Sequence, residues 1–425
     1  MNQIASENAP SPKVVIPHYA FGGLTWLAVT LLIVIHPEAF TQHFFNPELL
    51  AITHLLVLGW ITMIIFGALY QLLPVIMEVK LYSEPFAIAS FIMLGMGTIL
   101  LAFAFWQFSF GAILFVAATF VVLAVVFFVA NVLFTAHSST KKVIERTFIV
   151  TSASWLLFTV LAGLTLAINQ VYPFLKASQI ELLKLHAHAG IVGWFMQLII
   201  GVSSKLLPMF MVSHHVSTKK LKVAYYAINL GLITGLISLF FQIKSGVILS
   251  AIIIVPGIFS YLSFIYEAYT KRVKKQLDIG MKQTAFSFLI LVVPFFLIFS
   301  LLFNFKFLNN LTLPLSVAYG SAIVIGFITS LVMGQTYKTL PFIVWLKVYR
   351  GRIGKVVLPL PKDLYSEKIA IAQLWLFAIG FVLLLIGISA SVITILLSGA
   401  IVLLLSATLY NFNLFKIIFH KPKNK

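Results

Sequence analysis

The chain has 425 residues, of which 61% are hydrophobic and only 9% are charged, and its formal net charge is +18. A soluble domain of this size carries far more charge, and it has no core large enough to bury so much apolar surface. We therefore expect the chain to lie in a lipid bilayer. The sequence has no cysteine, which excludes disulfides, thiolate metal sites, iron–sulfur clusters and covalent c-type haem attachment.

The predicted elements are almost all membrane-spanning helices. Residues 1–16 are polar and should form a cytoplasmic N-terminal segment. Because no small-residue cleavage site follows the first apolar run, we interpret that run as a retained helix and not as a signal peptide. Hydropathy predicts an all-α polytopic bundle of about 12 transmembrane helices, each near the ~20 apolar residues that a bilayer requires. The expected spans are roughly 18–36, 49–76, 84–107, 109–136, 147–172, 182–211, 221–242, 246–269, 283–304, 314–345, 369–390 and 392–415.

One helix pattern occurs once in each third of the chain. A first residue is followed by glycines five and thirteen positions later and by a proline twenty positions later. The copies are His54, Gly59, Gly67 and Pro74; His188, Gly193, Gly201 and Pro208; and Ser321, Gly326, Gly334 and Pro341. This period predicts three repeats of four helices, roughly 17–137, 146–270 and 283–415, within one transmembrane domain covering 17–420. A basic cytoplasmic tail, 416–425, follows.

The distribution of lysine and arginine predicts the orientation. With both termini in the cytoplasm, only four of the 29 basic residues fall on the outer side: Lys176, Lys184, Lys244 and Lys306. This is a strong positive-inside signal for a multi-pass protein of a bacterial inner membrane. The net charge is then explained by topology and by contact with anionic lipid, and a nucleic-acid partner is disfavoured.

Histidines at matched repeat positions are the candidate site. Repeat symmetry predicts that His54, His188 and Ser321 lie at equivalent depths near the outer edge of their helices. An imidazole in hydrocarbon is unfavourable unless it is paired or ligated, and two such histidines can bind haem axially or provide two ligands to copper. His186 should project about 200° from His188 and so face a second pocket. Glycines such as Gly59 would let a flat macrocycle, or another helix, approach closely.

The second copy of the pattern carries a family resemblance. His186-x-His188-x-Gly-x-x-Gly193-Trp194, followed by Gly201 and Pro208, resembles the haem-bearing helix of subunit I of the heme–copper oxidases. It is most similar to that of the C-type oxidases and the nitric oxide reductases. That family also has twelve helices with three-fold pseudosymmetry. The resemblance implies that His54 and His188 ligate a low-spin haem b and that His186 binds a second haem or a metal.

The chain departs from this family at the copper site. The family has the H-x-H pair on the tenth helix, whereas here it is on the sixth, and the tenth helix carries Ser321 instead. The active-site copper of the family needs a His-His pair on the seventh helix, but His214-His215 falls in a loop. Catalytic residues therefore cannot be named, and the sequence leaves open whether the chain is an oxidoreductase. By architecture it also resembles the haem- and copper-containing NnrS-type membrane proteins linked to nitric oxide tolerance.

Two functions follow from these observations. The first is a haem-binding redox protein, with copper as an alternative or additional cofactor. It would act in respiratory electron transfer or nitric oxide handling, with cytochrome or other respiratory subunits as partners. The second is a transporter or channel that kept the bundle and lost its redox cofactors. The absence of an evident intramembrane carboxylate weakens a proton-coupled transporter.

Several polar residues have simpler interpretations. Gln71, Lys205 and Lys338 precede the three prolines by three positions, and we expect them to snorkel to the headgroups, with a polar ring at a pocket mouth as the alternative. His36, His43, His214 and His215 are expected to be solvated. His18 and His137 are expected to line the inner interface.

Overall fold

The computed structural model describes residues 8–303, 311–352 and 357–422. Every regular element in these ranges is a helix, and twelve continuous helical stretches are long and apolar enough to cross a membrane. The expected all-α polytopic bundle is therefore confirmed. Four of the lysines used to predict orientation lie outside the described residues: Lys306, Lys355, Lys423 and Lys425.

Eight of the twelve stretches are single α-helices. They are α2 (Pro12–Ile35), α5 (Glu84–Trp106), α6 (Ala112–Ser138), α7 (Ile144–Val171), α10 (Lys219–Phe240), α11 (Lys244–Thr270), α16 (Glu367–Ala390) and α17 (Ile393–Ile418). A ninth consists of α12 (Ile279–Ile290) and α13 (Val292–Phe303), which are separated at Leu291. The boundaries lie within about four residues of the hydropathy prediction, except that α2 begins six residues before the expected position 18, inside the segment 1–16 that was expected to precede the first helix.

The other three stretches contain the repeated pattern, and each has three parts. They are α3 (Pro47–His54), η2 (Leu55–Thr62) and α4 (Met63–Met77); α8 (Gln179–His188), η3 (Ala189–Met196) and α9 (Gln197–Met211); and α14 (Thr312–Ser321), η5 (Ala322–Ile328) and α15 (Thr329–Tyr349). The middle part of each is a π-helix, in which N–H groups bond to the carbonyl five residues back.

Local sequence explains where several helices begin. Ser11 accepts a hydrogen bond from the backbone N–H of Lys13, and Pro12 occupies the first helical turn of α2. Asn46 caps α3 in the same way, with Pro47 next in the chain. Asp278 caps α12 by accepting from the N–H of Met281. Ser11 and Asp278 therefore begin the first helix of the first and third repeats.

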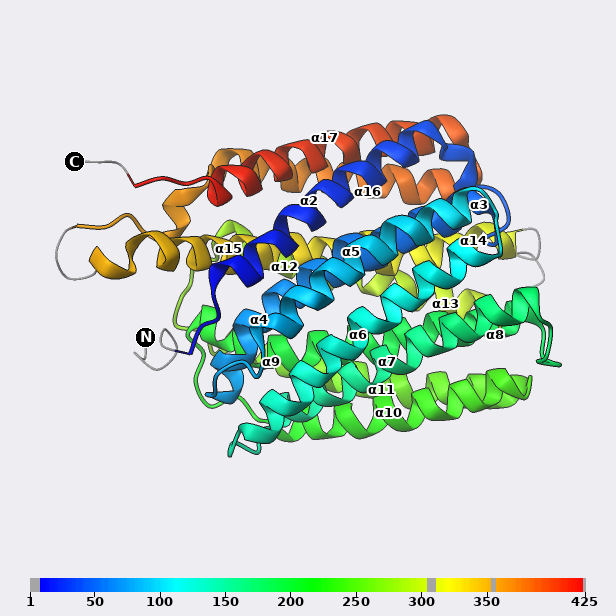
Figure 1. Cartoon of the computed structure of the whole chain (residues 1–425), viewed down its shortest axis with the longest axis horizontal. Helices are drawn as coiled ribbons and strands as arrows, with labels where there is room; N and C mark the ends of the chain where they lie inside the picture. Colours follow the sequence, from blue (N-terminus) through cyan, green and yellow to red (C-terminus); the bar gives the residue numbers. More distant parts are fainter. Residues whose placement is uncertain (1–7, 304–310, 353–356, 423–425) are drawn as a thin grey trace. The chain divides into compact units, whose positions relative to one another are not determined.

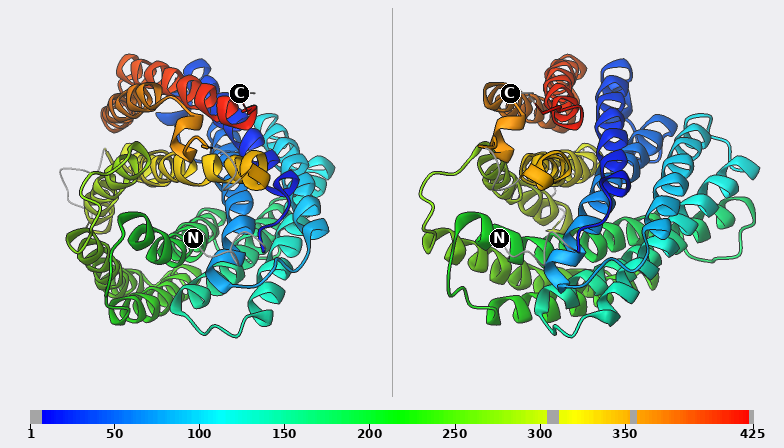
Figure 2. Two further views of the ribbon diagram at one scale, coloured as in Figure 1. Left: turned by 90° about the vertical axis from the view of Figure 1, so that its left-hand side faces the viewer. Right: turned by 60° about the vertical axis from the view of Figure 1, so that its left-hand side comes forward.

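The chain divides into two compact units. One contains residues 1–10, 70–97 and 110–277, and the other contains 11–69, 98–109 and 278–425. In the first unit α10 and α11 run side by side, as Figure 1 shows, and α7 packs against both η3 and α9. In the second unit α2, α16 and α17 lie together, as Figure 2 shows, and α12 packs against α15. The second and third repeats thus fall in different units, whereas the first is divided between them.

Candidate functional site

The three π-helical segments lie at the same place in each repeat. Each begins at the residue after the first position of the pattern, which is His54, His188 or Ser321. Gly59, Gly193 and Gly326 fall inside these segments. π-Helices are rare and frequently occur at functional sites. The π-helical segments therefore occur at the positions that the repeated sequence pattern had identified.

Glycines of the pattern are places of close helix packing. A Cβ added at Gly59 would lie 2.7 Å from the Thr25 side chain on α2, and one added at Gly193 would lie 2.7 Å from Trp155 on α7. At Gly326 the nearest side chain is Phe381 on α16, 2.6 Å away. The sequence predicted that these glycines let either a flat macrocycle or another helix approach closely. In the structure, a neighbouring helix packs closely against each of them.

The second glycine of each pattern packs on the first helix of its own repeat. Added Cβ atoms would lie 2.5 Å from the Cβ of His18 at Gly67, and 2.7 Å from the Cβ of Phe148 at Gly201. At Gly334 the contact is with the carbonyl oxygen of Gly280, again 2.7 Å away. In all three repeats, a glycine at the same position of the pattern therefore allows this helix to pack closely against the first helix of the repeat.

His54 is half-buried at the end of α3, directly before η2. Its Nδ1 lies 2.7 Å from the carbonyl oxygen of Leu50. Because a carbonyl can only accept, Nδ1 must be the donor, and the lone pair of the neutral ring is then on Nε2. The ring also packs 4.6 Å from that of Phe105 on α5, measured between centroids.

His188 has the same local arrangement as His54. It is half-buried at the end of α8, directly before η3, and its Nδ1 donates over 2.8 Å to the carbonyl of Lys184, four residues back. Nε2 again carries the lone pair. A histidine that ligates a metal through one nitrogen almost always donates its other N–H to such an acceptor. When neutral, both imidazoles therefore have the tautomer that allows a metal to bind through Nε2.

His186 faces a different neighbour from His188. Its Nδ1 donates over 3.0 Å to the carbonyl oxygen of Thr159 on α7, whereas His188 bonds to its own helix. A Cβ added at Gly163 on α7 would lie 3.0 Å from Cε1 of His186, so the missing side chain makes room for the ring. The rings of His186 and His188 therefore point toward different neighbours, in agreement with the predicted angle of about 200° between them.

The candidate histidines belong to both units. His54 lies in the unit that contains 11–69, and His186 and His188 lie in the unit that contains 110–277. Ser321, the third equivalent residue, is buried before η5. Among the described residues, no three or more His, Asp or Glu side chains are grouped so that they could hold a metal ion.

The predicted set of Gln71, Lys205 and Lys338 does not behave uniformly. Gln71 is buried, Lys205 is exposed, and Lys338 forms a 2.7 Å ion pair with Asp278 at the start of α12. Only Lys205 is exposed as a snorkelling side chain should be. Lys338 instead ties α15 to α12, a role that the sequence did not reveal because its partner is 60 positions away.

The other histidines also differ in part from expectation. His18, expected near the inner interface, is fully buried between helices on α2, and its Nδ1 donates over 2.8 Å to the carbonyl of Val14. The absent side chain of Gly67 makes space for it. His137, His214 and His215 are exposed, and His36 lies 3.4 Å from the carboxylate of Glu38.

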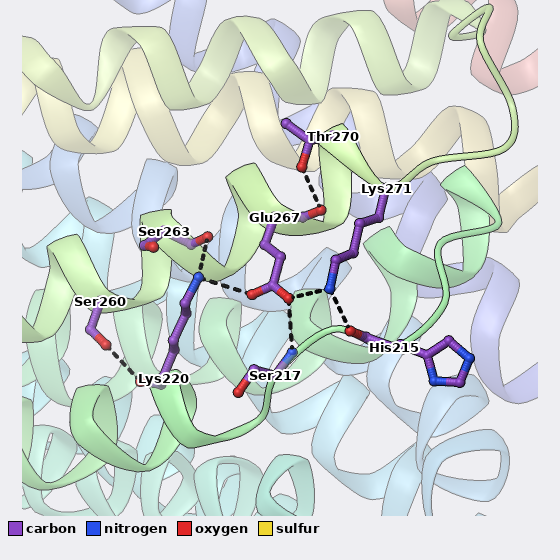
Figure 3. A network of polar contacts seen from close by, with 8 residues as sticks. All are labelled: His215, Ser217, Lys220, Ser260, Ser263, Glu267, Thr270 and Lys271. Atoms are coloured by element: carbon purple, nitrogen blue, oxygen red, sulfur yellow. Dashed lines mark hydrogen bonds and ion pairs between the residues drawn. The ribbon is translucent and has the colours of Figure 1, made fainter.

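A carboxylate fixes the loop that carries His214 and His215 (Figure 3). Glu267, near the end of α11, lies 2.9 Å from the Nζ of Lys220 and 2.7 Å from the Nζ of Lys271. The same Lys271 ammonium donates to the carbonyl of His215, and the N–H of Ser217 donates to Glu267. The His-His pair therefore sits in a charge-stabilised loop and does not enter a membrane helix.

Two layers of polar side chains, one partly buried and one fully buried, were not foreseen from the sequence. In the second repeat, Gln197 and Asn229 exchange two hydrogen bonds of 3.1 and 3.0 Å, and Trp155 donates to Asn229. In the third repeat, Gln283 and Gln373 both donate to the sulfur of Met333. Polar residues scattered among apolar ones give no sequence signal that they meet.

Comparison of the chain with protein-family models found no match, and comparison with curated proteins found none.

Proposed function

We propose that the chain is a haem-binding membrane redox protein that acts in respiratory electron transfer or nitric oxide handling. The observation that supports this is the shared arrangement of His54 and His188. Each precedes a π-helical segment at the same repeat position, and each has Nδ1 held by the carbonyl four residues back. Neutral imidazoles with Nε2 as donor atom suit iron in both common oxidation states.

The residues fit the group in chemical terms. His54 and His188 would hold the haem iron, and the bound haem would supply one-electron exchange or a site for a diatomic gas. The protein contribution is orientation: each Nδ1–H bond fixes the plane of the ring relative to its own helix. That His54 and His188 serve one low-spin b-type haem remains a prediction from their matched positions.

His186 is proposed as a ligand of a second cofactor, either haem or copper. Its ring is held against α7 by Thr159, so it is oriented independently of His188. One imidazole does not make a copper site, and no group of three His, Asp or Glu side chains surrounds it in the described part of the chain. A complete oxygen-reducing centre is therefore not part of the proposal.

Absorbance spectroscopy tests the proposed haem. The protein purified in detergent should show a Soret band and a reducible alpha band, and a pyridine haemochrome assay should identify haem b. His54→Ala and His188→Ala should each abolish or strongly shift the low-spin spectrum. His214→Ala, which changes an exposed loop histidine, is the matched control and should leave it unchanged.

A colourless wild-type protein, or a spectrum unchanged in both variants, would contradict the assignment. The colourless outcome would support a transporter or channel on the same bundle. A loss in only one of the two variants would show that the ligands do not act as a pair.

A further inference from the structure

Five tryptophan and tyrosine rings form an unbroken series of contacts inside one of the two compact units. The rings of Trp26 on α2 and Trp60 on η2 are stacked with centroids 5.8 Å apart, and Trp60 meets Tyr410 on α17 at 5.3 Å. Tyr410 lies 6.0 Å from Tyr337 on α15, and Tyr337 lies 5.0 Å from Tyr365, two residues before α16. Each spacing is one at which aromatic rings are in contact. The series therefore leads from the interior of α2 to the loop before α16.

The choice of residue at these five positions is not explained by packing alone. The chain contains 40 phenylalanines, 14 tyrosines and 7 tryptophans, yet every ring of the series is an indole or a phenol. A phenylalanine would fill such a site without bringing a polar atom into the core. Indole and phenol rings differ from a phenyl ring in another way, because they lose a single electron much more readily.

Hydrogen bonds decide which of these rings can hold a lasting radical. A phenol that has lost an electron is stabilised when a base takes its proton. Trp60 and Tyr410 donate over 3.1 Å to the hydroxyls of Thr329 and Thr336, and a hydroxyl is not a base at neutral pH. These inner rings can therefore lose an electron only briefly and must regain it from a neighbour.

Tyr365 differs from the inner rings because it lies near carboxylates and is the most exposed of the five. The exposed fraction is 4% for Tyr337 and 8% for Tyr365. Burial, followed by the negative charges of Asp278, Glu367 and Asp363, raises the pKa of the Tyr365 phenol. The phenol is therefore neutral at pH 7, and carboxylates near it can accept its proton when it loses an electron.

We propose that these five rings carry single electrons from Tyr365 to the π-helical segment η2. An oxidant beside η2 takes one electron from Trp60, and each ring then takes an electron from the next one in the series. Tyr365 is the last ring to be oxidised, and it gives its proton to a carboxylate. A one-electron reductant of the aqueous phase, of the ascorbate class, returns the electron to Tyr365, and the carboxylate returns the proton. The net step moves one electron from the reductant to the oxidant.

The natural oxidant rests on the proposed function, since it is the haem proposed above. His54, its proposed ligand, directly precedes η2, and Trp60 is the sixth residue after His54. With a haem at that position, the series would let oxidising equivalents reach Tyr365, where a soluble reductant can remove them. The path itself needs only the five rings, so it can be tested with a different oxidant.

A photochemical oxidant tests the path without a haem. Because the chain has no cysteine, Leu24→Cys introduces a single thiol at an exposed position of α2, two residues before Trp26. A ruthenium polypyridyl complex attached there becomes a one-electron oxidant when a soluble quencher follows a flash of light. A water-soluble spin trap, located by peptide mass spectrometry of the full-length protein, should then be found on Tyr365.

Phenylalanine variants separate the path from structural effects. Tyr410→Phe and Tyr337→Phe keep a packed ring but remove an oxidisable one, so each alone should lower trapping at Tyr365 at least tenfold. Tyr410→Trp restores an oxidisable ring and should restore trapping. Tyr261→Phe changes a tyrosine that is equally buried and hydrogen-bonded but outside the series. It is the matched control and should leave trapping unchanged.

Two results would overturn the proposal. One is trapping at Tyr365 that is undiminished in both Tyr410→Phe and Tyr337→Phe, since the charge would then travel by another route. The other is oxidation that stays at Trp26 in the labelled chain with all five rings intact. Because the ruthenium complex takes the place of the haem, a failure of the path is distinguishable from a failure of the haem proposal, which absorbance measures.

Discussion

The Nδ1–H of His186 donates across 3.0 Å to the carbonyl oxygen of Thr159, and this bond turns an imidazole of α8 toward α7. His188, two residues later, is held by its own helix instead. The two rings of the H-x-H motif are therefore oriented by different elements, which allows them to be removed independently.

His186→Ala should leave the low-spin haem spectrum in place, because His188 keeps its own orienting bond. If His186 binds a second haem or a metal, elemental analysis should show a partial loss of bound iron or copper. Unchanged metal content in this variant would identify His186 as a structural residue that only links α8 to α7.

Gly201→Ala should destabilise the second repeat by about 1–3 kcal/mol, the usual cost of overpacking. The added Cβ would lie 2.7 Å from the Cβ of Phe148, and backbone atoms of α7 leave little room for adjustment. Gly320→Ala is the control, since nothing lies within 4 Å of an added Cβ there and alanine favours the helix. Thermal unfolding in detergent measures both, and equal Tm values would refute the packing argument.

Asp278→Ala should cost more stability than Asp278→Asn. Both variants lose the ion pair with Lys338, but asparagine still caps α12 by accepting from the N–H of Met281. The difference should be roughly 1 kcal/mol, the typical worth of an N-cap. Lys338→Met in the Asn background should add little, because the pair is already broken. A large further loss would show that Lys338 has another important partner.

Glu267→Gln should loosen the loop between α9 and α10. The neutral amide cannot hold both Lys220 and Lys271, so the bond from Lys271 to the carbonyl of His215 loses its support. Amide hydrogen exchange at 212–218 should become faster. Glu181→Gln, which breaks only the local pair with Lys184, is the control and should leave this segment unchanged.

The purified chain should show no substantial oxygen reductase turnover with a reducing donor. An oxygen-reducing centre needs a metal held by several imidazoles beside a haem, and the third repeat has Ser321 where symmetry would place another histidine. An oxygen electrode provides the measurement. Cyanide-sensitive oxygen consumption by this single subunit would show the prediction to be wrong.

Much of the fold could be predicted because lipid imposes simple rules. Span lengths follow from bilayer thickness, and the repeated glycines and prolines mark equivalent helices. The π-helical segments could not be predicted, because runs such as Leu55–Thr62 are apolar all round and have no period to distinguish one helix type from another. Contacts such as Lys338 with Asp278 were also missed, since they depend on which helices become neighbours.

The π-helical segments change which way each histidine points. A hydrogen bond to the fifth residue back encloses one residue more than the α-helical bond does, so the chain before and after Leu55–Thr62 is out of angular phase. A relative that lacked a single residue here would rotate its histidine by about 100° relative to the glycine and proline that follow. Length variation in this short stretch would therefore redirect a ligand without changing any ligand residue.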